Sequence, residues 1–196
     1  RKWLNSGEYL RNQVDNYPQS PFRPDAKLAL GDTYISEKTT ESLLLGANEF
    51  REFLTFYPTH QRADYAQLQL ARSYMLQMLA PERDQSSTKD AVKEIEIFLQ
   101  RFPNSALMPE ARKMERETRD RLSEANYKVG FYYFRVKWYP GAIDRFRDVL
   151  ATDPGFSNRD AVYYHLAESL YRTDKHAEAL PYYERLLREF EKSEFL

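Results

Sequence analysis

Hydrophobic positions recur along the chain at helical spacing, in segments that aromatic-proline or Asp-Pro pairs divide. Each of four segments places large, mostly apolar residues at i, i+3, i+4 and i+7, which is one face of an α-helix. The four stripes are Phe50, Phe53, Leu54 and Tyr57; Ile95, Phe98, Leu99 and Phe102; Phe146, Val149, Leu150 and Asp153; and Tyr183, Leu186, Leu187 and Phe190. A poorer fifth copy, Trp3, Gly7, Leu10, Val14 and Tyr17, precedes Pro18. A helix is expected to end before each proline, because the residue ahead of proline disfavours the helical backbone.

A second kind of helical segment precedes these stripes and combines small with large residues. Its copies are Ala26, Leu30, Gly31 and Tyr34; Ala66, Leu70, Ala71 and Tyr74; and Ala161, Leu166, Ala167, Leu170 and Tyr171. A small residue beside a large one lets two helices approach closely. This alternation of two helix types resembles the tetratricopeptide repeat. It predicts an all-α superhelix of about five irregular repeats, the first of which is incomplete.

Composition supports this helical prediction. The chain holds 22 Leu and 17 Ala against 6 Val and 4 Ile, and β-branched residues are those that strands prefer. The dividing prolines lie 40, 45 and 51 residues apart, whereas the repeat is nominally about 34 residues long. Residues 37–46, 80–90 and 109–140 are therefore expected to form loops or extended helices. The last region would hold two consecutive helices or one long bent helix.

Charge and composition exclude several classes of function. With 29 basic and 30 acidic residues, the chain lacks the positive field of a general nucleic-acid binder, and the mixed charges of residues 110–121 indicate a solvated helix face. No apolar run is long enough to span a membrane. The absence of cysteine excludes thiol catalysis and Cys-ligated metals.

Candidate catalytic residues have simpler structural explanations. The Ser-x-x-Lys spacing at Ser86 lacks the other motifs of penicillin-binding enzymes, so these hydroxyls are expected to cap a helix that begins at Asp90. His60 is expected in a loop, His176 in an exposed turn, and His165 on a helix face with its hydrogen bonds satisfied. No enzyme activity, cofactor or metal is predicted.

Consecutive aromatic residues are the least explained feature of the sequence. Phe131-Tyr132-Tyr133-Phe134 cannot all enter one core, because neighbouring residues on a helix point in different directions. Packing between repeats would account for most of these rings. Some of them are expected to face a groove or a partner.

From about Tyr17 to the C-terminus, the sequence is similar to a known family in the order and spacing of its residues. The matching residues are Pro58-Thr59-His60, Asp64-Tyr65, Arg83-Asp84, Phe102-Pro103-Asn104-Ser105, Ala111, Asp120-Arg121-Leu122, Tyr127, Val129, Tyr132-Tyr133, Trp138 and Arg145. They resemble the BamD family, tetratricopeptide lipoproteins of the outer-membrane β-barrel assembly machinery. The segment from Phe102 to Asp153 is the most specific part, since the unusual spacing of 51 residues is also reproduced.

The resemblance implies a periplasmic scaffold in two functional halves. Residues 107–196 would dock a POTRA domain of the barrel-forming subunit, and residues 1–106 would receive unfolded outer-membrane proteins. Arg145 matches the arginine of the family's POTRA-contacting helix, and the stripe around Phe146 leaves it outside the core. Asp144, Arg147, Asp148 and Trp138 are further candidates for this docking surface. The candidates for the substrate-peptide groove are Pro21, Phe22, Tyr34, Tyr65 and Tyr74.

The resemblance also implies a location and further partners. Family members are tethered to the periplasmic face of the outer membrane by a lipid on a cysteine, which would lie upstream of Arg1 and is absent from this chain. Accessory assembly lipoproteins would be additional partners. The alternative interpretation is another periplasmic tetratricopeptide adaptor, serving cell-envelope or division proteins.

Overall fold

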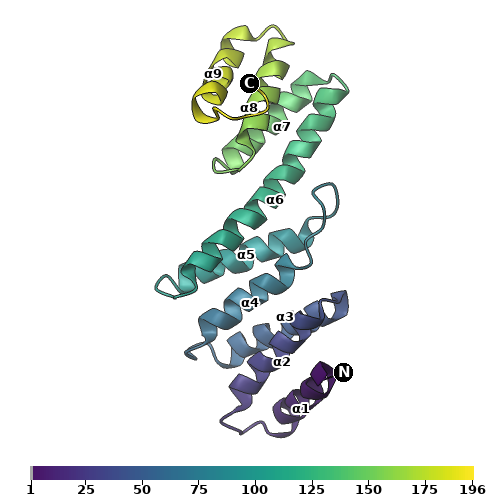
Figure 1. The fold of residues 1–196 in the computed structure, drawn as a ribbon, viewed down its shortest axis with the longest axis vertical. Coiled ribbons are helices and arrows are strands. Elements are labelled where there is room, and N and C mark those ends of the chain that lie inside the picture. The colour runs from purple at the N-terminus through teal and green to yellow at the C-terminus, as the bar shows by residue number, and fades with distance from the viewer. Residues whose placement is uncertain (1) are drawn as a thin grey trace. The chain divides into compact units, whose positions relative to one another are not determined.

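The computed structural model describes the backbone of residues 2–196 and the side chains from Gly7 onward, so the side chain of Trp3 lies outside the described residues. The described chain forms helices and turns without strands, which confirms the all-α prediction (Figure 1). The helices are α1 (Lys2–Asn16), α2 (Arg23–Glu37), α3 (Thr40–Phe56), α4 (Ala63–Met75), α5 (Ser86–Arg101), α6 (Met108–Arg135), α7 (Tyr139–Thr152), α8 (Arg159–Tyr171) and α9 (His176–Glu189).

The extra residues of the irregular repeats are distributed in three ways. Residues 37–46 add no loop, because α2 ends at Glu37 and a capping box between Thr39 and Ser42 starts α3 directly. Residues 76–85 form a connection between α4 and α5. The region after Pro109 is one continuous helix, α6.

The predicted cap at Ser86 is wrong. Helix α5 begins at Ser86 rather than at Asp90, and the residue before it, Gln85, makes no side-chain cap. Thr88 instead donates a hydrogen bond to the side-chain amide oxygen of Gln85, at 2.8 Å. His176 is exposed as expected, but it is the first residue of α9 rather than part of a turn.

The chain divides into two compact units. The N-terminal unit comprises Arg1–Leu79 and Gln85–Thr118, and the C-terminal unit comprises Ala80–Asp84 and Arg119–Leu196. Within the N-terminal unit, α1 packs on α2, α2 on α3, α3 on α4 and α4 on α5; within the C-terminal unit, α7 packs on α8 and α8 on α9. The division of function between residues 1–106 and 107–196 stays a prediction.

Each unit has its own core, built from the predicted stripes. Phe50 and Phe53 of α3 are fully buried in the N-terminal unit, and Phe146 and Val149 of α7 are buried in the C-terminal unit. Glycines allow the two helices of a pair to approach. A Cβ atom at Gly31 would lie 2.6 Å from the Phe50 ring, and one at Gly130 would lie 2.8 Å from the Phe146 ring.

The turns after the second helices of the pairs share one backbone hydrogen bond. Ser105 donates its backbone N–H to the carbonyl of Phe102, and Ser193 does the same to Phe190. The side chain of each serine then binds an aspartate on the first helix of the same pair: Ser105 donates to Asp64 at 2.5 Å and Ser193 to Asp160 at 2.7 Å. These turns therefore fasten the end of the second helix to the start of the first.

Candidate partner-docking surfaces

The corner between α6 and α7 presents a tryptophan to solvent. Lys137 adopts the left-handed conformation, with φ of 62°, and donates its N–H to the carbonyl of Phe134. The N–H of Trp138 reaches back to the carbonyl of Tyr133 at 2.9 Å, which completes a Schellman motif. The Trp138 and Tyr133 rings meet edge to face, 4.7 Å apart.

Trp138 is held in place although 55% of its surface is exposed. Its indole packs against Gly141, where a Cβ atom would be only 2.6 Å from the ring. This glycine stands one helical turn before Arg145. The corner therefore combines a positioned aromatic ring with the charged face of α7, a pairing common at protein interfaces.

The outer face of α7 carries three charged side chains that lack ion-pair partners in the described part of the chain. Asp144, Arg145 and Asp148 are exposed, and none of them has an ion-pair partner among the described residues. Arg147 differs, because it donates to Glu178 of α9 at 2.5 Å. Of the predicted docking residues, Arg147 therefore links two helices of the unit, while the other three charges are available to a partner.

The five candidates for the substrate groove lie in different surroundings. Pro21 and Phe22 lie in the exposed turn before α2, whereas Tyr34 is buried between α1 and α2. Tyr65 and Tyr74 lie on α4 and are half-buried against the N-terminal core. Their assignment to a single groove stays a prediction.

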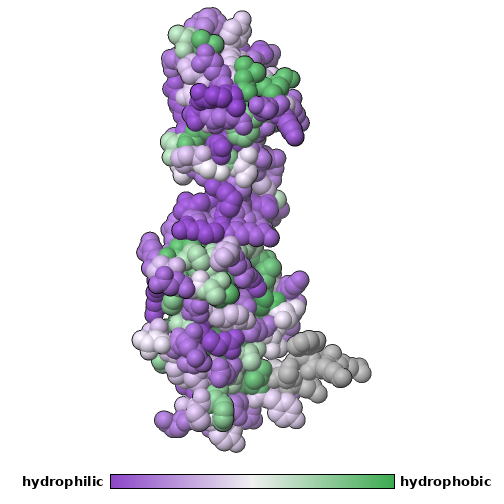
Figure 2. Space-filling model, turned by 60° about the vertical axis from the view of Figure 1, so that its left-hand side comes forward, coloured by the Kyte–Doolittle hydropathy of each residue, from purple (hydrophilic) through white to green (hydrophobic). Residues whose placement is uncertain are grey.

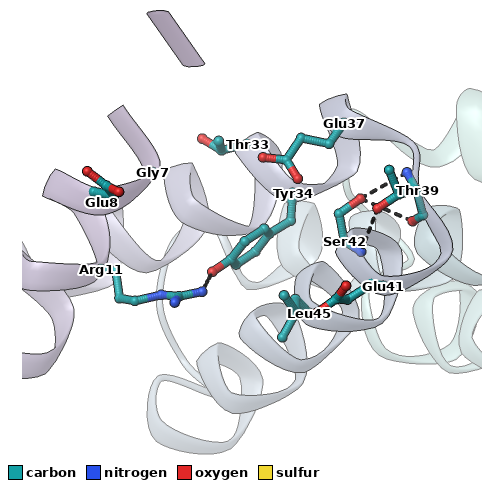
Figure 3. A pocket seen from close by; sticks show the side chains of 10 residues that line it. All are labelled: Gly7, Glu8, Arg11, Thr33, Tyr34, Glu37, Thr39, Glu41, Ser42 and Leu45. Carbon is teal, nitrogen blue, oxygen red and sulfur yellow. Dashed lines mark hydrogen bonds between the residues drawn. The ribbon is translucent and has the colours of Figure 1, made fainter. Parts of the chain in front are cut away.

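Tyr34 borders a pocket of about 270 Å³ in the N-terminal unit. Figure 3 shows Arg11 of α1 reaching the Tyr34 hydroxyl, to which it donates a hydrogen bond, and the Thr39–Ser42 capping box at the opposite side. The lining residues are Gly7, Glu8, Arg11, Thr33, Tyr34, Glu37, Thr39, Glu41, Ser42 and Leu45. Sequence patterns had singled out only Tyr34 as a binding residue among them.

A polar network joins α2 and α4 beside Tyr65. The Tyr65 hydroxyl donates to Asp32 at 2.8 Å, and the Gln69 amide donates to the Tyr65 oxygen at 2.7 Å. Burial raises the pKa of the Asp32 carboxyl, although the hydrogen bonds that Tyr65 and Gln69 donate to Asp32 oppose the shift. Tyr65 thus uses its hydroxyl to hold the two helices together and leaves its ring face to Arg62, whose guanidinium lies 4.6 Å from the ring centroid.

His165 lies on a helix face in the core of the C-terminal unit, and its Nδ1 has hydrogen-bond partners. Its Nδ1 lies 2.7 Å from the carbonyl of Ala161 and 3.2 Å from the Tyr127 hydroxyl. The rings of Phe131 and Phe134 meet it edge to face, each 5.0 Å away. This burial lowers the pKa of the imidazole.

His165 should make the C-terminal unit less stable in mild acid. Because its pKa is lower in the folded than in the unfolded chain, the unfolded chain binds more protons, and stability falls as pH drops below about 6.5. We expect the melting temperature to fall between pH 7.5 and pH 5.5, and to fall less in His165→Gln, which carries the residue found at the matching place in α4. An equal fall in both proteins, followed by circular dichroism, would show that the buried imidazole is not responsible.

Two partners on these surfaces were missed by sequence reasoning. Glu178 lies 31 positions from Arg147, and no local pattern connects the two residues. Gly141 was overlooked because its role depends on where the Trp138 ring lies. The available signal in the sequence was a glycine three residues after a tryptophan.

The described residues offer no cluster of three or more His, Asp or Glu side chains that could hold a metal. Of the helices described, none is long and apolar enough to cross a membrane. The face drawn in Figure 2 is mostly hydrophilic, with hydrophobic patches on both units.

Comparisons with known proteins show which family and which repeat the sequence matches. Residues 1–164 match the family model YfiO, described as an outer membrane lipoprotein, and residues 161–193 match a tetratricopeptide repeat model. Curated relatives include the outer membrane protein assembly factor BamD of Caulobacter vibrioides, 24% identical over 85% of this chain and 54% of that protein, and that of Vibrio cholerae, 25% identical over 78% and 66%. The chain thus spans between half and two thirds of the length of these relatives.

A solved tetratricopeptide repeat protein from Parabacteroides merdae aligns with 95% of this chain and 73% of its own, with 13% identity and a TM-score of 0.41. The assignment of the repeat fold rests on the helix pairs and on the repeat model that matches α8 and α9. Because the family model covers most of the sequence, the chain belongs to the YfiO family of outer membrane lipoproteins, in which its relatives are BamD assembly factors.

Proposed function

We propose that this protein is a non-catalytic scaffold of outer-membrane protein assembly. Its relatives are named as outer membrane protein assembly factors, and its helix pairs form the type of repeat that presents surfaces to other proteins. In this role the C-terminal unit docks a POTRA domain of the barrel-forming subunit. The N-terminal unit receives unfolded outer-membrane proteins.

The observation that carries the docking proposal is the unpaired Arg145 beside the Trp138 corner. An arginine that is exposed and without an opposite charge is free to meet a carboxylate of a partner, and a positioned tryptophan supplies the apolar anchor of an interface. Asp144 and Asp148 flank the arginine, so the partner surface is expected to carry both signs of charge. Arg147 contributes by fixing α7 to α9.

The substrate proposal rests on aromatic residues of the N-terminal unit. Outer-membrane strands alternate apolar and polar residues, and aromatic girdles flank the apolar band that they form. Exposed Phe22 and half-buried Tyr65 and Tyr74 offer flat apolar surface for such an extended chain. Pro21 and Tyr34 complete the set of proposed groove residues.

The proposed location is the periplasmic face of the outer membrane. The family description as a lipoprotein supports a lipid anchor on the full protein. Accessory assembly lipoproteins are proposed as further partners.

Arg145→Glu tests the docking surface directly. We expect it to weaken binding of the purified POTRA domains by 10-fold or more, because the new carboxylate repels the partner carboxylate that Arg145 would meet. Binding can be followed by isothermal titration calorimetry. Arg188→Glu is the matched control, since Arg188 is an exposed arginine on α9 whose one ion-pair partner among the described residues, Glu189, lies 3.6 Å away.

The comparison of the two variants decides the outcome. Docking through α7 requires that Arg145→Glu lose affinity while Arg188→Glu keeps it. Equal affinities of Arg145→Glu and the unaltered protein would place the POTRA contact elsewhere.

A further inference from the structure

The first helices of the pairs can be compared position by position, because each carries one small residue against its partner helix. Gly31 of α2 and Gly130 of α6 both face a buried phenylalanine. Ala71 of α4 and Ala167 of α8 take the same place in the repeat pattern, and both are fully buried. These four small residues define a common register for α2, α4, α6 and α8.

In three of these helices, the positions just before and two after the small residue are buried. Leu30, Leu70 and Leu166 stand before it and are at most 2% exposed. Thr33, Ser73 and Ser169 stand two positions after it, and each donates its hydroxyl to the carbonyl four residues earlier. The helix that precedes each pair covers this face: α1 covers α2, α3 covers α4 and α7 covers α8.

In helix α6 of the C-terminal unit, the two matching positions are exposed instead of buried. The matching positions are Val129, 41% exposed, and Tyr132, 61% exposed, and Val136 continues the same face one turn later at 54%. We call Val129, Tyr132 and Val136 the α6 stripe. The C-terminal unit contains no helix ahead of α6 that could cover it. An apolar face that is buried in three pairs is thus left open in the fourth.

The surroundings of the α6 stripe are basic. Residues 126–137 include Lys128, Arg135 and Lys137 and no acidic residue. Lys128 is paired with Glu82 at 3.0 Å, whereas Arg135 and Lys137 are exposed and have no ion pair within the described part of the chain. A partner bound to the stripe would therefore meet the unpaired positive charges of Arg135 and Lys137, which lie at the C-terminal end of the stripe.

We propose that the α6 stripe binds an amphipathic helix of a partner protein, in the place that a preceding helix fills in the other pairs. The stripe is spaced i, i+3 and i+7, about 10 Å along the axis, which suits two turns of a helix with aliphatic residues at the same spacing. Acidic residues beside those aliphatic residues would meet Arg135 and Lys137. Tyr132 stands where the other helices carry a small hydroxyl residue, so its ring is the anchor for the partner. Because this ring is larger, the partner helix lies farther from the axis of α6 than a covering helix lies in the other pairs.

The α6 stripe adjoins the Trp138 corner, because the Tyr133 ring contacts both Tyr132 and Trp138, but its occupant can be tested without POTRA domains. The probes are two fluorescein-labelled helical peptides with identical leucines at i, i+3, i+4 and i+7, one flanked by Glu and the other by Lys. Fluorescence anisotropy should show that the Glu-flanked peptide binds the full chain at least 10-fold more tightly. Reversing Arg135 and Lys137 to Glu should invert this preference.

Tyr132→Ser supplies the decisive variant, because serine is the residue that α4 and α8 carry at this position and is compatible with the helix. It should weaken binding of the Glu-flanked peptide by 10-fold or more. Leu187→Ser on α9 is the matched control, since Leu187 is 62% exposed against 61% for Tyr132. The proposal is overturned if neither peptide binds, if both bind equally, or if Tyr132→Ser and Leu187→Ser behave alike.

Discussion

Phe50→Ala is expected to destabilise the N-terminal unit by about 3–5 kcal/mol, which is typical for removing a fully buried phenylalanine ring. The ring is inaccessible to solvent, packs with Leu28 and Leu70, and fills the space that Gly31 leaves open. A loss of this size is a large fraction of the 5–15 kcal/mol that usually separates folded from unfolded chains. Urea denaturation followed by circular dichroism measures the free energy of unfolding.

The control for Phe50→Ala lies on the same helix. Phe56 is 61% exposed, so Phe56→Ala should change the free energy of unfolding by no more than about 0.5 kcal/mol. Hydrogen exchange should locate the loss of protection by Phe50→Ala in α2, α3 and α4. Similar stabilities of the two variants would contradict the packing of α3 on α2.

Phe146→Ala is expected to cost a similar 3–5 kcal/mol in the C-terminal unit, and here the structure offers a way to refill the cavity. Phe146 is fully buried, and a Cβ atom on Gly130 would point at its ring from 2.8 Å. Gly130→Leu alone should therefore destabilise the protein by about 1–3 kcal/mol through overpacking. In the Phe146→Ala background the same leucine enters vacated space and should restore part of the lost stability.

A double-mutant cycle measures how the effect of Gly130→Leu on stability changes sign when Phe146 is replaced by Ala. The coupling between Gly130→Leu and Phe146→Ala is expected to reach about 1–3 kcal/mol, since the two side chains would compete for one volume. Leu and Ala are both good helix formers, so neither substitution weakens its helix directly. Additive effects of the two changes would mean that α6 and α7 do not meet at Gly130.

Helical periodicity accounts for most of what could be predicted about the fold. Phe53, Ile95, Phe146 and Leu186 are buried because each stands on the apolar stripe of its helix. The same reasoning placed Arg145 outside the core. These are local properties, which depend only on residues within one or two turns.

One local feature was mispredicted, and features that depend on distant residues were not predictable. The start of α5 was misplaced because serines were expected to cap it, whereas Gln85 precedes the helix and its side chain receives a hydrogen bond from Thr88. Asp153 occupies an apolar position of its stripe, and it is buried because Ser123 donates to it from α6 at 2.7 Å. Likewise, the aromatic run of α6 revealed that some rings face outward, but the exposure of Tyr132 follows from the absence of a covering helix.

The hydrogen bonds from the turn serines to the helix aspartates also bear on how an array of helix pairs can gain or lose a pair. Ser105 binds Asp64, and Ser193 binds Asp160, so each hydrogen bond begins and ends within one helix pair. Ser157 likewise binds Asp120 within the pair of α6 and α7, at 2.6 Å. Cutting the chain at two equivalent turns would remove a pair together with its own fastening and leave none half made. The serine–aspartate hydrogen bond is therefore contained within each helix pair, and removing a single helix would leave one of its two partners without the other.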